Sequence, residues 1–369
     1  MREVGQWIGQ FDQVAGLGGN ATLSVEPDKP GYCFANFQQD SYSCRINFSY
    51  AINGDNFKAT SVPPMTIFDR QRQTLVIASD HPDAANYVLS NTYTVEGVFT
   101  GNDIAGTWYG DAGTQGGFRL KKSLVDTNPP DEILTWEGFK LRATDLLKNG
   151  SPSRFLFRGH GSNKWHLCST LHRIDRFDLI RFRHEACDHL VRAVNATLPR
   201  RYDISNGYDF GALLSLVQHH GFPTPLLDWT WSPYIAAYFA FSSRRAKDPD
   251  SSSRIFVFDA DAWVGAHQQP ANIQDPAPVV SIREFEAYDN PRQISQQSCH
   301  TFTNVADVAA WIRYMGGENK KYLKTFDIPN SFRRDAMRDL AFMGVTAAAM
   351  FPGLDGLCRG VRERLFLGD

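Results

Sequence analysis

The chain has 369 residues, which is longer than one average domain and predicts two. It is 42% hydrophobic and 13% aromatic, so it has enough apolar side chains for sizeable cores and is too apolar for a disordered chain. Its 38 basic and 40 acidic residues leave a formal charge of −2, which excludes a global positive field that would attract nucleic acid or acidic membranes. Any binding site for a polyanion must therefore be local.

The apolar runs and the cysteines indicate the compartment. No apolar run approaches the ~20 residues of a membrane span, and the first residues lack the basic-then-apolar pattern of a signal peptide. The six cysteines include no CxxC pair, and a chain of this length does not need disulfide bonds for stability. These features predict a cytoplasmic protein with reduced thiols and no membrane partner.

The first third of the chain is predicted to be all β. Short runs rich in β-branched and aromatic residues alternate with Asn-Gly and Pro-Pro turn signals. An opening strand and a closing hairpin with glycine and tryptophan resemble those of small lipocalin-like barrels. Because a sheet of many strands must hide its edges, we expect a barrel or a sandwich, with a filled interior if it is a barrel. The expected strands lie at 5–11, 66–69, 74–78, 92–100, 105–110 and 116–120.

An Asn-Pro-Pro run marks the predicted linker at 125–134, which divides the chain into a β domain at 1–124 and an α+β domain at 135–369. Beyond the linker, apolar residues recur every three and four positions, a spacing typical of helices that bury one face. Helices are expected at 136–148, 177–198, 210–220, 233–241, 332–343 and 354–365, and strands at 155–157, 254–258 and 279–282.

Several common enzyme classes are excluded by their motifs. The chain has no GxxxxGK[ST] string and no GxSxG string, so it is predicted to be neither a P-loop nucleotidase nor an α/β-hydrolase. His184 and His189 are five residues apart, which on a helix separates their side chains by ~140°. They therefore do not form the histidine pair of a zinc protease, and no metal is expected.

The predicted strand at 155–157 ends in the first candidate site residues, Arg158 and Gly159. A guanidinium can bind a phosphate through two parallel hydrogen bonds, and a glycine lets a ligand approach the backbone. This pair therefore predicts an anion site at the end of a buried strand. The alternative is that Arg158 pairs with a structural carboxylate such as Asp228.

The segment 218–233 is the second candidate. Gln218, His219 and His220 lie at a predicted helix C-terminus, where the dipole favours imidazolium. One of them could donate a hydrogen bond or carry a proton, or all three could simply cap the last carbonyl groups. The loop predicted after them holds prolines, an aspartate and two tryptophans, which favours a pre-organised pocket over a spacer. Trp229 could stack on a planar ring or belong to the core.

These residues resemble those of the FRG domain, a family named after its Phe-Arg-Gly string. The resemblance covers residues 135–369, and its most specific part is the string from QHHG to DWT. Two positions depart from the family pattern: His160 stands where the family commonly has Gln, and Ser298-Cys299-His300 replace a Gly-containing string. The matching strings are Phe157-Arg158-Gly159, the helix around Glu185, Gln218-His219-His220-Gly221, Thr224-Pro225-Leu226-Leu227-Asp228-Trp229-Thr230, Ala236-Ala237-Tyr238-Phe239-Ala240, Asn290-Pro291-Arg292 followed by Gln296-Gln297, and Phe342-Met343-Gly344-Val345 followed by Met350-Phe351-Pro352-Gly353-Leu354-Asp355-Gly356.

The order of these parts also resembles, remotely, that of ADP-ribosyltransferases, which implies NAD as substrate and no metal. Cleavage of the nicotinamide–ribose bond needs an anchored pyrophosphate, a flat nicotinamide and a polar group on the ribose. On this resemblance Arg158 would anchor phosphate or ribose, and Trp229 or Tyr238 would flank the nicotinamide. Asp228 or Thr230 would orient the loop. Gln297 or Glu286 would hold the ribose. The implied catalytic residues are Arg158, His219, Asp228 and Gln297, and the implied ligand-binding residues are Gly159, His160, Gln218, Thr224, Trp229, Thr230, Tyr238 and Glu286.

Three functions are therefore open. The first is an ADP-ribosyltransferase-like enzyme with an unknown protein or nucleic-acid acceptor, a chemistry that would suit a toxin or phage-defence effector whose N-terminal domain binds a regulator. The second is a binding module that recognises a nucleotide or phosphate without chemistry and releases no nicotinamide. The third is a nuclease in which His219, His220 and Asp228 position a metal or act as acid and base. Adjacent histidines on a helix point in different directions, which disfavours the nuclease.

Overall fold

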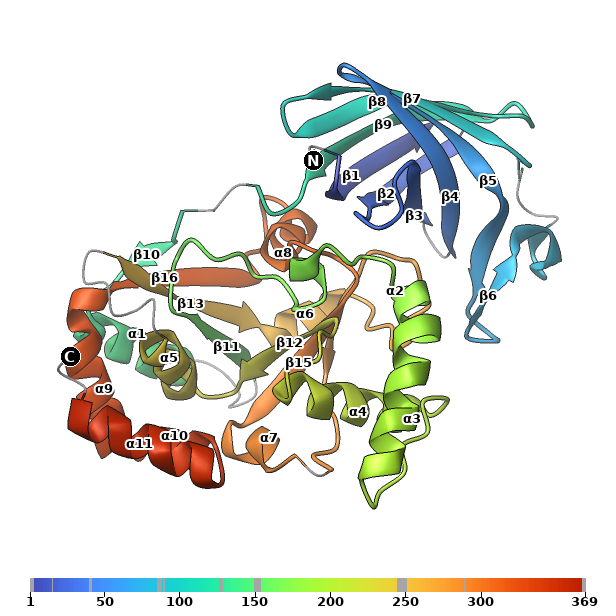
Figure 1. Cartoon of the computed structure of the whole chain (residues 1–369). Helices are drawn as coiled ribbons and strands as arrows, with labels where there is room; N and C mark the ends of the chain where they lie inside the picture. Colours follow the sequence, from blue (N-terminus) through green and yellow to red (C-terminus); the bar gives the residue numbers. More distant parts are fainter. Residues whose placement is uncertain are drawn as a thin grey trace.

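The computed structural model describes residues 3–14, 16–39, 42–84, 88, 90–125, 129–148, 154–243, 251–288 and 290–366. The chain forms an N-terminal β domain and a larger mixed α/β domain that lie against each other (Figure 1). Within these ranges, every helix is too short or too polar to cross a lipid bilayer.

The N-terminal domain is a closed antiparallel β-barrel, which confirms the barrel alternative. Nine strands form its sheet in the order β4-β3-β2-β1-β9-β8-β7-β5-β6, and β4 also pairs with β5. Because β6 only extends β5, eight strands close the barrel and leave few free edges. The strands are β1 (Gly5–Gln13), β2 (Gly16–Val25), β3 (Tyr32–Gln39), β4 (Tyr42–Asn53), β5 (Asn56–Asp69), β6 (Thr74–Ile77), β7 (Tyr93–Thr100), β8 (Asp103–Gly110) and β9 (Gln115–Lys122).

Side chains fill the interior of the barrel. Trp7, Phe48, Phe57 and Phe99 are buried in one apolar cluster, in which the ring of Phe99 lies 6.0 Å from Trp7 and 6.1 Å from Phe57. The gap that remains has a volume of about 50 Å³. Ligand pockets usually measure roughly 300–1,000 Å³, so the interior is a packed core, as its size predicts.

The second domain is built around a seven-stranded sheet in the order β10-β16-β13-β11-β12-β15-β14. Neighbouring strands run antiparallel, except that β10 pairs parallel with β16. β10 lies inside the stretch predicted as a linker, so the end of that stretch belongs to the sheet; residues 126–128 of the stretch lie outside the described residues. The strands are β10 (Glu132–Ile133), β11 (Phe155–His160), β12 (Leu226–Thr230), β13 (Ser252–Asp259), β14 (Val280–Arg283), β15 (Ser298–Thr303) and β16 (Leu323–Pro329).

Helices cover this sheet, and most begin and end near their predicted bounds. Ser232 accepts a hydrogen bond from Ile235 N and Pro233 occupies the first position of α5, as its sequence predicts. A π-helical turn at Phe182–Ala186 joins α2 to α3, so the long helix predicted at 177–198 is one continuous but irregular segment. The helices are α1 (Trp136–Lys148), α2 (Leu179–Arg181), α3 (Cys187–Thr197), α4 (Gly207–His219), α5 (Pro233–Ser242), α6 (Ala260–Ala266), α7 (Pro291–Ser295), α8 (Val308–Gly316), α9 (Arg333–Phe342), α10 (Ala347–Met350) and α11 (Leu354–Phe366).

The strand β12 corrects the prediction that the segment after α4 is a loop. Leu226, Leu227, Trp229 and Thr230 are buried, and the strand lies in the middle of the sheet between β11 and β15. A strand buried on both faces lacks the alternation of apolar and polar residues by which strands are recognised. The two prolines before β12 therefore indicated a loop more strongly than residues 226–230 indicated a strand.

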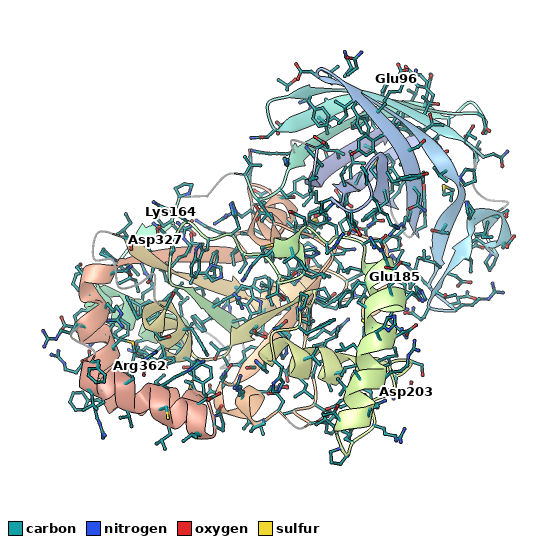
Figure 2. The ribbon with its side chains drawn as sticks, in the orientation of Figure 1. Glu96, Lys164, Glu185, Asp203, Asp327 and Arg362 are labelled. Carbon is teal, nitrogen blue, oxygen red and sulfur yellow. The ribbon has the colours of Figure 1, made fainter. Side chains whose placement is uncertain are left out.

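Polar contacts fix the barrel on the second domain. Gln6 donates to Asn304 O over 3.0 Å and accepts from Ala306 N over 2.7 Å, just beyond the end of β15. Arg45 donates two hydrogen bonds to the carboxylate of Asp178, over 2.7 and 2.6 Å, and both side chains are about one-tenth exposed. Side chains of both domains lie in the space between them (Figure 2), where a cavity of about 190 Å³ remains between the barrel strands β1 and β9 and the helix α8. The barrel is therefore attached directly to the sheet that carries the candidate site.

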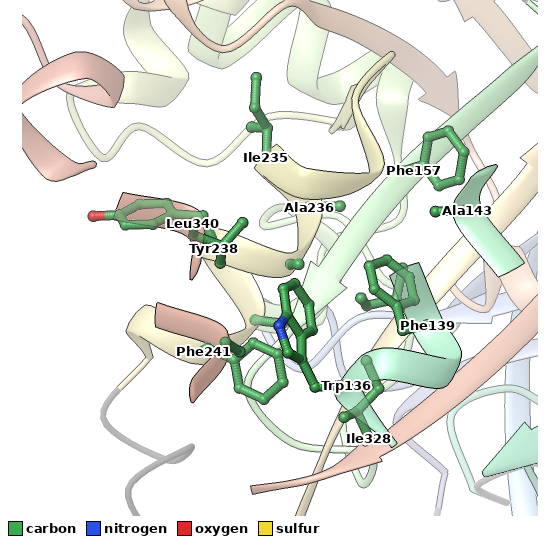
Figure 3. Packing of buried hydrophobic residues seen from close by; sticks show 14 of the residues in the cluster. Trp136, Phe139, Ala143, Phe157, Ile235, Ala236, Tyr238, Phe241, Ile328 and Leu340 are labelled. Atoms are coloured by element: carbon green, nitrogen blue, oxygen red, sulfur yellow. The ribbon is translucent and has the colours of Figure 1, made fainter. Parts of the chain in front are cut away.

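One apolar core packs α1, α5 and α9 against one face of the sheet. Trp136 lies stacked on Phe139 at 5.7 Å and edge-on to Phe241 at 6.0 Å (Figure 3). Phe157 of β11 and Tyr238 of α5 belong to the same cluster. This core fixes the position of α5 relative to β11, the two elements between which the candidate site lies.

Candidate functional site

A cavity of about 350 Å³ opens where β11, β12, α5 and the end of α4 meet. Its volume lies in the lower part of the range of ligand pockets, roughly 300–1,000 Å³. Both candidate segments of the sequence contribute to it. The lining residues are Phe157, Arg158, Gly159, Gly161, Trp165, His219, Asp228, Trp229, Thr230, Ala236, Phe239, Ser243, Gln296, Ser298 and Phe351.

Arg158 supplies the positive charge of the cavity. Its Nε donates to His160 Nε2 over 3.2 Å and its Nη1 donates to the backbone carbonyl of Asp228. Burial lowers the pKa of Arg158 to about 10 although the nearby Asp228 acts in the opposite direction, so the side chain stays charged at neutral pH. Among the described residues, Arg158 has no ion pair and its Nη2 has no hydrogen bond. The guanidinium is thus held in place with one nitrogen left for a ligand.

Asp228 supplies a carboxylate to the same cavity. Its Oδ1 accepts a hydrogen bond from Gln218 Nε2 over 2.5 Å and lies 3.5 Å from His300 Nε2. Thr224 donates to Gln218 Oε1 and thereby fixes the amide that holds the carboxylate. The Asp228 side chain is 35% exposed, and no described residue donates to its Oδ2. The carboxylate is therefore oriented by one oxygen and accessible through the other.

Two histidines accompany this carboxylate. His219, the last residue of α4, lines the cavity, and burial lowers its pKa below the ordinary value of 6.5 although Asp228 acts in the opposite direction. No described residue makes a hydrogen bond to its Nε2. His300 is fully buried behind Asp228, with Ser215 Oγ 3.2 Å from its Nε2, and burial lowers its pKa to about 4. Burial therefore favours the neutral form of both rings, and a neutral imidazole is the form that can accept a proton.

Aromatic side chains form the opposite wall. The rings of Phe239 and Phe351 lie 6.0 Å apart at 86°, which makes an apolar corner. Trp165 is half-exposed and lies edge-on to His160 at 6.1 Å. An apolar wall opposite a few polar groups is typical of sites for ring-containing ligands. Among the described residues, no group of three or more His, Cys, Asp or Glu side chains is arranged to hold a metal ion.

The glycines of the Arg-Gly-His-Gly run allow a close contact between β11 and α5. A Cβ atom on Gly159 would lie 1.9 Å from Ala236 O, and one on Gly161 would lie 2.2 Å from Ser243 Cβ. The sequence predicted that a glycine is needed at position 159 so that a ligand can approach the backbone. The structure shows another need for it, because a side chain there would clash with the backbone of α5. Both glycines bring the helix onto the strand, and the cavity forms beside that contact.

Some predicted site residues lie behind the lining and orient it. Gln218 and Thr224 hold the Asp228 carboxylate as described, and His160 accepts from Arg158 while its ring packs edge-on to Phe256 at 5.0 Å. His160 is buried outside the lining, so its contact to a ligand would be indirect.

Two residues of β12 both line the cavity and belong to the core. Trp229 is 2% exposed and donates to Thr301 Oγ1 over 3.0 Å, so most of its ring packs inside the sheet. Thr230 is also buried and its Oγ1 accepts from Ser232 N over 3.1 Å at the start of α5. Neither ring nor hydroxyl is free to move toward a ligand.

Three other predicted residues lie away from the lining. Tyr238 is buried in the core and its hydroxyl donates to Glu363 over 2.8 Å. Gln297 has a left-handed φ of 48° and its carbonyl accepts from Trp231 N. Glu286 is exposed outside the cavity. Their assignment to the nicotinamide or the ribose has no support from their positions.

The lining also contains residues that the sequence did not single out. Phe239 follows Tyr238 on α5, and because neighbours on a helix differ by ~100°, one faces the core and the other the cavity. Gln296, next to Gln297, donates to Met350 O over 3.0 Å and links the start of β15 to α10. Phe351 comes from a distant segment that is part of the resemblance to the FRG family, but no role in the site was predicted for it.

The comparison with protein families agrees with this geometry. The model of the FRG domain matches residues 153–249, a stretch that contains β11, α4, β12 and α5 and most of the cavity lining. No curated protein matches the chain. Gln296, Ser298 and Phe351 lie beyond the matched stretch but in the same folded unit. Residues 153–249 of the second domain thus match the FRG domain model, and a β-barrel precedes them.

Proposed function

We propose that the cavity of the FRG domain binds NAD and that the protein cleaves the nicotinamide–ribose bond, transferring ADP-ribose to a macromolecular acceptor. One observation carries this proposal: the Arg158 guanidinium and the Asp228 carboxylate line one cavity, and no ion pair joins them. An anionic ligand with a reaction centre that becomes positive would interact with both charges at once.

Arg158 would bind a phosphate. Two of its nitrogens are already fixed by His160 and the Asp228 carbonyl, so binding through Nη2 costs little side-chain entropy. Burial excludes water from the guanidinium and strengthens its attraction for an anion.

Asp228 would stabilise the reaction centre. As the C1′–N1 bond breaks, its electron pair leaves with nicotinamide and positive charge develops on the ribose, next to Oδ2 of the carboxylate. The acceptor then forms a bond to C1′ and loses a proton, which the neutral ring of His219 can accept. Phe239 and Phe351 would flank the nicotinamide, the role predicted for Trp229 or Tyr238, because they form the apolar wall of the cavity.

The direct test measures nicotinamide released from NAD by the full chain. Asp228→Asn keeps the shape of the side chain and removes its charge, so release should fall by about 10²–10³-fold, as for other groups that stabilise transition-state charge. Arg158→Gln should weaken NAD binding. His220→Ala is the matched control for His219→Ala, because His220 is the adjacent histidine but is exposed and outside the lining.

Each result has a defined meaning. If NAD raises the melting temperature and no nicotinamide is released with any acceptor, the domain is a nucleotide-binding module and the transferase is refuted. If Asp228→Asn releases nicotinamide at the wild-type rate, the assignment of the carboxylate is wrong.

A further inference from the structure

We infer that Arg292 and Arg359 form a second anion subsite at the mouth of the cavity, so that the site selects ligands with a diphosphate over those with a single phosphate. This inference rests on the proposed nucleotide function and extends it to two residues outside the cavity lining. Neither residue belongs to the stretch that matches the FRG domain.

Arg292 lies directly behind two lining residues. Its Nη1 donates to His219 O over 3.3 Å, and its guanidinium carbon lies 5.7 Å from the ring centre of Phe351. Because His219 and Phe351 both line the cavity, Arg292 contacts two lining residues without belonging to the lining itself. Among the described residues, Arg292 has no carboxylate partner.

Arg359 approaches the same ring from α11. Its guanidinium carbon lies 4.8 Å from the ring centre of Phe351, and no described carboxylate forms an ion pair with it. Two acidic residues lie one turn away on the helix, Asp355 and Glu363; neither forms an ion pair with Arg359 among the described contacts, and Glu363 accepts from the Tyr238 hydroxyl. Phe351 is therefore flanked by two arginines whose charges are not neutralised by ion pairs.

Arginines without an ion pair also occur elsewhere in the molecule, because Arg333 donates to the Phe241 carbonyl and has no carboxylate partner among the described residues. At the cavity, however, three such arginines lie in or beside the lining, namely Arg158, Arg292 and Arg359, none of which has an ion pair with a described carboxylate. The region is thus locally cationic although the whole chain has a formal charge of −2.

The volume of the cavity indicates which part of a dinucleotide would lie inside it and which part would lie outside, near Arg292 and Arg359. About 350 Å³ is enough for one ring with its ribose, close to the lower limit for a ligand pocket of roughly 300 Å³. The remainder of a dinucleotide would leave through the mouth. Its first phosphate would lie beside Arg158 and its second beside Arg292 and Arg359, because these two arginines flank the lining residue Phe351.

The experiment measures affinities of the full chain for AMP, ADP and NAD by calorimetry. Arg292→Gln and Arg359→Gln are tested singly and together. Arg362→Gln is the matched control on the same helix (Figure 2), because Arg362 is exposed and, among the described contacts with the Phe351 ring, the guanidinium groups are those of Arg292 and Arg359. The double variant should bind ADP and NAD about tenfold or more weakly, because each charge-assisted hydrogen bond contributes strongly, while its affinity for AMP changes less than about twofold. Arg292→Lys, which keeps the charge, should recover part of the affinity.

The outcomes separate this inference from the proposed function. If the double variant binds NAD as tightly as the wild type while Arg158→Gln does not bind, the subsite is refuted and the proposed function stands. Equal losses for AMP and ADP, or an equal loss in Arg362→Gln, also refute the subsite, because the effect would be general electrostatics. If the wild type binds none of the three nucleotides, both proposals fail.

Discussion

Gly159→Ala tests whether the contact between β11 and α5 controls the site. The new Cβ atom would lie 1.9 Å from Ala236 O and 2.9 Å from both Ala236 C and Ala240 N. These are backbone atoms, which cannot rotate away, so the helix and the strand must separate by about 1 Å. Overpacking of this kind costs about 1–3 kcal/mol, and we expect the upper end. For a domain of this size, 3 kcal/mol lowers the Tm by about 6–12 °C.

Thermal unfolding of the full chain measures this effect, and nicotinamide release measures its consequence for the cavity. Gly265→Ala in α6 is the matched control, because a Cβ atom there would meet nothing within 4 Å. A helical Gly→Ala change at an open position should leave the Tm unchanged or raise it slightly. If Gly159→Ala unfolds within about 1 °C of the wild type and keeps its affinity for NAD, the close contact does not determine the site.

Three further changes test the energetics of the second domain. Arg254→Met should lower the free energy of unfolding by about 3–5 kcal/mol, because it leaves Asp327 buried without its 2.7 Å partner. Arg158→Met should lower it much less, because no carboxylate loses an ion pair. Urea unfolding compares the two variants, and equal losses would contradict the unpaired state of Arg158. His300 has a pKa of about 4 in the folded state and an ordinary pKa near 6.5, so between these pH values only the unfolded state gains a proton. The free energy of unfolding should therefore fall by about 3 kcal/mol as the pH drops from 6.5 to 4. A His300→Gln variant with the same pH dependence would refute this assignment. Ser232→Ala should lower stability by about 1 kcal/mol through loss of the cap of α5, and an unchanged Tm would show that this cap does not contribute.

Elements with strong local signals could be predicted from the sequence. The bounds of α1 match those expected, and the cap and proline of α5 determine where that helix begins. The β-rich composition predicted a barrel or a sandwich, but only the pairing of β4 with β5 distinguishes them. The alternation of apolar and polar residues along β4 and β5 is equally compatible with a barrel and with a sandwich, so the sequence does not reveal this pairing. The central strand β12 was missed because both of its faces are buried.

The site was predictable only as far as residue type indicates chemistry. Arg158 and Asp228 are charged residues within the buried strands β11 and β12, where charged side chains are rare unless they are paired or functional. Phe351 reaches the cavity only through the packing of α10 on α7, where Met350 O accepts hydrogen bonds from Ser295 and Gln296. Contacts of this kind join segments more than fifty residues apart, so no local pattern contains them.

The charges of the cavity are better explained by a ligand than by stability. Burial lowers the pKa of Arg158, which means that the folded environment disfavours its charge. A carboxylate in direct contact would offset that cost, and Asp228 is close enough to influence the guanidinium electrostatically. Yet Gln218 orients the Asp228 carboxylate by Oδ1, and Arg158 bonds to the backbone carbonyl of the same residue instead. Because the two charges are held near each other without an ion pair, the proposed ligand would complete both sets of interactions if it presented a phosphate to Arg158 and a hydrogen-bond donor or developing positive charge to Asp228.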